Sequence, residues 1–83
     1  MNENLNIAEC ASQNAKIRAW LLEGRTITSL QAQGMFGCMR LASRVWDIRN
    51  QGLDVKVRRR LTPSGKHIAE YFLDEQTLAE YGQ

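Results

Sequence analysis

Two groups of basic residues, both beyond residue 39, carry the chemistry that this sequence offers. Arg40 and Arg44 are spaced by one helical turn, so both would lie on one face of a helix. Arg58–Arg60 form the second group, and Lys66 and His67 follow shortly after them. A guanidinium group makes paired hydrogen bonds with a phosphate or with the O6 and N7 atoms of guanine. This pattern therefore indicates binding to a polyanion.

The charge distribution favours the same class of partner. The 83-residue chain has a net charge of only +2. Residues 1–15 carry −2, residues 16–67 carry +8, and residues 68–83 carry −4. A basic middle between acidic ends favours a polyanionic partner. The alternative is that folding mixes these charges over the surface and that their segregation has no function.

Other classes of function receive no support from the sequence. There is no apolar run near eighteen residues and no signal peptide, so we expect no membrane partner. Cys10 and Cys38 are too few for a disulfide scaffold and indicate a reducing cytoplasm. With a single histidine and no catalytic triad, phosphate loop or carboxylate pair, we expect no metal, no cofactor, no small-molecule substrate and no enzyme activity.

The N-terminal part of the chain predicts one helix. Residues 1–10 show no clear period and are predicted to be flexible. Residues 12–23 have an apolar helical face, and Gly24 is placed to end the helix in the left-handed region. Residues 25–27 are then either a very short strand or an extended link.

A second helix is predicted from its cap. Thr28 is a typical N-cap residue, and Gln31, three residues later, completes a capping box. The helix would cover residues 29–34, and the two glycines Gly34 and Gly37 would break the chain after it.

The third predicted helix covers residues 39–51 and carries the first arginine group. Its apolar stripe is formed by Leu41, Val45 and Ile48, and Gly52 ends the pattern. Trp46 lies at the edge of this stripe and is expected to pack partly under the segment that follows. Arg49 is expected to cover the core with its aliphatic stem.

After Gly52 the apolar period changes to two, which predicts a β-hairpin over residues 53–73 with a turn at residues 62–65. The domain would therefore cover residues 11–73, followed by a short acidic C-terminal tail, residues 74–83, with one or two helical turns capped by Asp74. Three helices followed by a hairpin is the order of a winged helix. The expected fold is mainly α with a small β-hairpin, a winged helix-turn-helix of three helices and a β-wing.

These residues resemble a family of small winged helix-turn-helix proteins found mostly in bacteriophages and prophages. The family pattern RLxxRIxxLRxxG is similar to Arg40–Gly52, and the SGK hairpin pattern is similar to Ser64–Tyr71. Val45 and Ile48 differ from the usual isoleucine and leucine but keep the apolar stripe. The resemblance covers about residues 15–73 and implies this fold with binding to double-stranded DNA. We expect a transcriptional regulator in the cytoplasm of a bacterial cell or a phage-infected host.

In helix-turn-helix proteins the N-terminal part of the second helix of the motif reads base edges in the major groove. The candidates here are Met39, Arg40, Ser43 and Arg44. Arg40 is favoured for DNA contact. Arg44 is left open between DNA contact and an ion pair with Asp47 or with an acidic residue of the first helix. Which of the two arginines contacts a base is not decided by the sequence.

The basic hairpin would contact the DNA backbone or enter the minor groove. Arg58 and Arg60 lie on one side of the strand and Arg59 on the other, with Lys66 and His67 across the turn. The alternative role for these charges is to protect an edge strand against aggregation.

Thr28 and Ser29 complete the candidate set, because a helix N-terminus offers backbone N–H groups to phosphate. Capping alone is the simpler role for Thr28. The alternative function is a winged-helix protein–protein interaction module that docks a partner or a second copy through Leu73, Leu78 and Tyr81. A homodimer is compatible with a palindromic operator, and the oligomeric state stays open.

Overall fold

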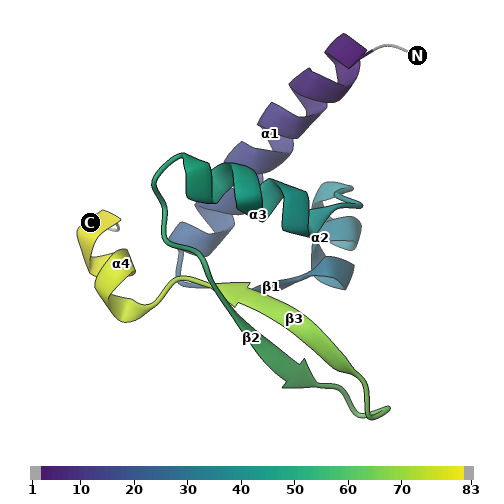
Figure 1. The fold of residues 1–83 in the computed structure, drawn as a ribbon, viewed down its shortest axis with the longest axis vertical. Helices are drawn as coiled ribbons and strands as arrows, with labels where there is room; N and C mark the ends of the chain where they lie inside the picture. Colours follow the sequence, from purple (N-terminus) through teal and green to yellow (C-terminus); the bar gives the residue numbers. More distant parts are fainter. Residues whose placement is uncertain (1–2, 82–83) are drawn as a thin grey trace.

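The computed structural model describes residues 3–81, which form four helices and three short strands (Figure 1). The predicted fold class, mainly α with a small β-hairpin, is confirmed. In chain order the elements are α1 (Glu3–Leu22), β1 (Ile27–Thr28), α2 (Ser29–Phe36), α3 (Leu41–Asn50), β2 (Lys56–Leu61), β3 (His67–Phe72) and α4 (Glu75–Tyr81).

The helices α1, α2 and α3 enclose one apolar core. The predicted stripe of α3 is confirmed, because Leu41, Val45 and Ile48 are all buried. They pack with Ile17 and Leu21 of α1 in one cluster. Because the buried residues of α3 recur at helical spacing, the opposite face of this helix is left to solvent.

The strands form an antiparallel sheet in the order β1-β3-β2. The predicted turn is confirmed: Thr62 N donates to Lys66 O (2.8 Å), and Gly65 has a φ of 88°. The first strand of the hairpin begins at Lys56, however, and not at residue 53. Leu53 and Val55 are buried in the helical core, so the segment between α3 and β2 packs against the helices before the chain enters the sheet.

The helix α1 begins at Glu3, nine residues before the predicted start at residue 12. The structure thus places residues 3–10 in this helix, for which the sequence predicted no regular structure, and their flexibility stays a prediction. This segment contains neither glycine nor proline, so nothing in it interrupts a helix. An apolar period is needed only where a helix packs, and its absence here does not exclude a helix.

The break between α2 and α3 also differs from the prediction. The helix α2 continues through Gly34 to Phe36, and it is Gly37 alone that turns the chain, with a φ of 64°. Cys38 is buried and donates its N–H to Ala32 O (3.1 Å), which ties the link to α2. The helix α3 therefore begins at Leu41, and Met39 and Arg40 lie in the link before it.

Replacement of Gly34 and of Gly37 by alanine should change the free energy of unfolding in opposite directions. An added Cβ has no heavy atom within 4 Å at either position. Gly34→Ala should raise the free energy of unfolding by roughly 0.5–1 kcal/mol, because Gly34 lies inside a helix. Gly37→Ala should lower it by about 1 kcal/mol, because alanine is strained at positive φ. Urea denaturation of both variants checks the pair, and equal effects would contradict the revised boundary.

The C-terminal segment folds as the predicted short capped helix. Asp74 Oδ1 accepts a hydrogen bond from Thr77 N (2.8 Å), and this bond lowers the pKa of Asp74. Tyr81 OH donates to Gly52 O (3.3 Å), which links α4 to the end of α3. Leu73 is buried in the core, so it is not available to a docking partner as the alternative function required.

Candidate nucleic-acid interface

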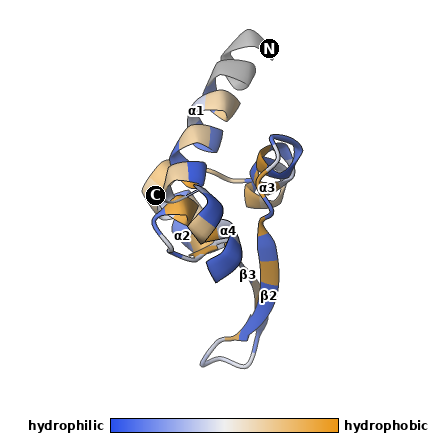
Figure 2. Cartoon of the chain, turned by 90° about the vertical axis from the view of Figure 1, so that its left-hand side faces the viewer, coloured by the Kyte–Doolittle hydropathy of each residue, from blue (hydrophilic) through white to orange (hydrophobic). Residues whose placement is uncertain are grey.

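The helix α3 and the hairpin lie along one flank of the molecule. Figure 1 shows the hairpin extending away from the helices below α3, and Figure 2 shows β2 directly beneath α3, with α2 and α4 toward the other side. Most of β2 is hydrophilic in Figure 2. The two predicted contact elements are therefore neighbours on the same flank.

Arg44 is held inside the protein. Its Nη2 lies 3.2 Å from Asp47 Oδ2, and its side chain is only 14% exposed. Asp47 Oδ2 also accepts a hydrogen bond from Asn14 Nδ2 of α1 (3.2 Å). Of the two roles left open by the sequence, the structure confirms the ion pair with Asp47. Asp47, which holds Arg44, thus also links α3 to α1.

Arg40 and Met39 lie at the exposed entrance of α3. The backbone carbonyl of Arg40 accepts hydrogen bonds from Ser43 N (3.1 Å) and Arg44 N (3.2 Å), so Arg40 is fixed at the N-terminal end of the helix. Its side chain is exposed, and that of Met39 is also exposed. Ser43 is half-buried on the first turn. Arg40 is thus the member of the predicted arginine pair that remains accessible.

The three wing arginines divide between the two faces of the sheet. Arg58 Nε donates to Glu70 Oε1 (2.9 Å), and Arg60 Nη1 donates to Glu70 Oε2 (3.0 Å). The Glu70 side chain is 7% exposed and also accepts a hydrogen bond from Thr26 Oγ1 (3.2 Å). The hydrogen bond from Arg58 is the main cause that lowers the pKa of Glu70. Arg58 and Arg60 therefore balance a buried carboxylate.

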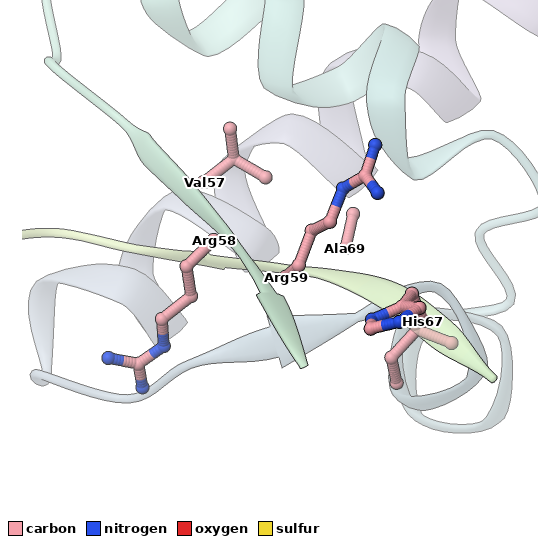
Figure 3. A pocket seen from close by; sticks show the side chains of 6 residues that line it. Val57, Arg58, Arg59, His67 and Ala69 are labelled. Atoms are coloured by element: carbon pink, nitrogen blue, oxygen red, sulfur yellow. The ribbon is translucent and has the colours of Figure 1, made fainter. Parts of the chain in front are cut away.

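Arg59 lies on the other face of the sheet. Figure 3 shows Arg58 and Arg59 pointing to opposite sides of β2, with Arg59 extending toward the helices. The register pairs Arg59 with Ala69 and Leu61 with His67, so Arg59 and His67 share a face. The surface here is hollowed over about 570 Å³, with Val57 also in its wall. This face, on the side of α3, is the part of the wing open to a ligand.

The remaining predicted residues lie around the wing and the start of α2. Lys66 is exposed at the turn, and Ser29 is exposed at the first residue of α2. Thr28 is buried and forms the predicted capping box: its Oγ1 accepts from Gln31 N (3.3 Å), and its N–H donates to Gln31 Oε1 (3.0 Å). The cap is confirmed. Because it occupies the Thr28 side chain, any contact of Thr28 with a ligand would have to use the backbone.

Two residues of this region were misjudged or missed from the sequence. Trp46 is 65% exposed, so the prediction that it packs under the hairpin is wrong. It is one turn from Ala42 and falls on the solvent face of α3, a position that helical spacing alone could have indicated. Glu70 was missed because its partners lie on another strand.

Arg49 donates its Nε to Val55 O (2.9 Å), which fixes its side chain over the chain that leaves α3.

The comparison with protein families decides the class of this chain. A family described as "Winged helix-turn-helix domain" matches residues 12–76. The chain belongs to this family. Membership in a winged helix-turn-helix family suggests DNA binding, and it confirms the winged helix-turn-helix part of the predicted resemblance. The comparisons with curated proteins and with solved structures gave no match.

In this winged helix-turn-helix protein, α2 and α3 form the motif, and α3 has the position of the helix that reads base edges in other helix-turn-helix proteins. The hairpin of β2 and β3 is the wing, and β1 adds a third strand to it. Within residues 3–81, none of the helices combines the length and apolar character needed to cross a membrane.

Proposed function

We propose that this winged helix-turn-helix protein binds double-stranded DNA as a transcriptional regulator of phage or prophage type and acts by binding, without catalysis. The helix α3 would enter the major groove, and the wing would lie on the backbone or in the adjacent minor groove. The observation that carries the proposal is the position of Arg59 and His67, on the face of the wing turned toward α3.

The electrostatics of this flank support the proposal. Arg44, Arg58 and Arg60 form ion pairs with carboxylates. Arg40 and Arg59 are exposed and form no ion pair with the side chains of residues 9–81. Arg40, Arg59 and Lys66 are therefore available to phosphates. Contacts with phosphates supply most of the sequence-independent affinity for DNA.

One experiment tests the proposal as a whole. A random pool of DNA duplexes is incubated with the protein, bound sequences are selected, and their affinities are measured by fluorescence anisotropy at two salt concentrations. We expect enrichment of a defined motif and an affinity that falls as salt rises. Binding without enrichment would contradict the regulator and favour an architectural role. Undetectable binding at low salt would contradict DNA binding and would favour the alternative function, a winged-helix protein–protein interaction module.

Removal of Arg59 should weaken this binding without loss of the fold. Arg59→Ser removes an exposed cation, so the slope of log K against log salt should become shallower by about 0.9 if one phosphate contact is lost. Titration over several salt concentrations measures the slope.

Arg25→Ser is the matched control for this variant. Arg25 is also exposed but pairs with Glu23 (2.8 Å) and lies over the ring of Trp20, away from the wing turn. The control should keep the wild-type slope. Equal slopes for both variants and the wild type would show that Arg59 does not contact phosphate.

A further inference from the structure

The first two turns of the solvent face of α3 carry no free cation. Within Leu41–Asp47 the only basic residue is Arg44, which is bound to Asp47. Arg49, in the last turn, is exposed and donates its Nε to Val55 O. The first turns present instead the exposed Ala42 and Trp46, with the half-buried Ser43 beside them. In helix-turn-helix proteins this end of the helix reads the bases, so here it has no free arginine of its own to read guanine, and we expect it to recognise a different feature of the groove.

The exposed face of α3 is apolar at its centre. Trp46 is one turn after Ala42, so the two side chains lie on the same face. The exposed Met39 lies just before the helix. A shallow depression of about 480 Å³ on α3 is lined by Ala42, Ser43 and Trp46 together with Arg44 and Asp47. If this face binds a ligand, its apolar centre favours contact with an apolar group of that ligand.

The C5-methyl group of thymine is the apolar group that the major groove displays. We propose that α3 reads thymine methyl groups through Trp46, with Ala42 and Met39 beside it, so that the protein prefers sites with thymines at these contacts. The inference rests on the proposed DNA binding and names the chemical group that is read. Ser43 contributes a hydroxyl that can both donate to and accept from a base edge.

Charge complementarity identifies DNA as the occupant of this face. The apolar centre of α3 is bordered by Arg40 at its N-terminal end. Arg59 and His67 lie on the wing face turned toward the helices. A strip of apolar and neutral side chains between Arg40 and Arg59 matches a groove whose floor shows methyl groups and whose edges are phosphates.

The test removes the methyl group alone. The probe is the duplex most enriched from a random pool, prepared once with thymine and once with deoxyuridine, which lacks only the C5-methyl group. Because burial of one methyl group corresponds to about a fourfold change in affinity, the wild type should bind the uridine duplex about fourfold more weakly per contacted thymine. Trp46→Ser should bind both duplexes with equal, reduced affinity.

Arg59→Ser is the matched control, since it should weaken binding to both duplexes but keep their ratio. Trp46 is exposed, so Trp46→Ser should fold normally, and thermal unfolding verifies this. A wild-type protein that binds both duplexes equally would overturn the inference while DNA binding stands. So would a Trp46→Ser variant that keeps the wild-type ratio. Absence of binding to either duplex at low salt would overturn the proposed function itself.

Discussion

Replacement of Glu70 by glutamine is expected to lower the free energy of unfolding by about 1–3 kcal/mol at neutral pH. Glu70 is buried and accepts hydrogen bonds from Arg58, Arg60 and Thr26. Glutamine keeps the size of the side chain but loses the charge and one acceptor. The two arginines are more than half exposed, so solvent screens their attraction and keeps the loss below that of a fully buried pair.

The same variant should change the pH dependence of stability. Because the pKa of Glu70 is lowered in the folded state, its ionised form stabilises the fold above its ordinary pKa of 4.5. This contribution is lost as the pH falls from there through the lowered pKa. Glu70→Gln should therefore remove part of the acid destabilisation of the wild type. Urea denaturation between pH 7 and pH 3 measures both effects.

Glu80→Gln is the control for this experiment. Glu80 is exposed on α4 and makes no ion pair with another side chain of residues 9–81, so its loss should change stability by less than about 0.5 kcal/mol. If the free energy of unfolding of Glu70→Gln fell as steeply toward low pH as that of the wild type, this result would contradict the role assigned to the Glu70 carboxylate.

Truncation of Ile48 should have the largest effect on stability. Ile48 of α3 is completely buried in the core that includes Ile17 and Leu21 of α1, and Ile48→Ala is expected to lower the free energy of unfolding by about 2–5 kcal/mol. The total free energy of unfolding of a small domain is roughly 5–15 kcal/mol, so a loss of this size should leave the variant partly unfolded at 37 °C. Denaturant titration followed by circular dichroism measures the loss.

Two further variants, Ile48→Val and Leu30→Ala, are the controls for this prediction. The first removes one methylene from the same site and should lower the free energy of unfolding by about 0.5–1.5 kcal/mol. The second truncates an exposed leucine on α2 and should change it by no more than about 0.5 kcal/mol. Equal losses for Ile48→Ala and Leu30→Ala would contradict the core described above.

The sequence predicted those features that depend on residues close in the chain. The stripe of Leu41, Val45 and Ile48 recurs at helical spacing and needs no knowledge of its partners. The cap at Thr28 involves a residue three positions away. The turn at residues 62–65 depends on the local preferences of proline and glycine. Such short-range patterns led to the right order of elements, and the order led to the fold.

Features that depend on residues distant in the chain were not predicted. The capture of Arg58 and Arg60 by Glu70 depends on strand register, which places Glu70 opposite Arg58. The pair of Arg44 with Asp47 was one of the two roles that the sequence left open, and the choice between them depends on how α1 packs against α3, because Asn14 of α1 donates a hydrogen bond to Asp47. Charge counting treats all eleven basic residues alike. It is the fold that separates those bound internally from those open to a ligand.

The short β1 strand has a consequence for the mechanics of the wing. It pairs with β3 only at Tyr71 and Glu70, whereas β2 and β3 remain paired out to Leu61 and His67. The outer half of the hairpin is thus two-stranded, and a two-stranded ribbon is easily bent. The inner half is clamped to the helices by the third strand. We therefore expect the outer half of the wing to bend more easily than its base. In the proposed complex with DNA, the turn would then follow the local width of the duplex while α3 keeps its position.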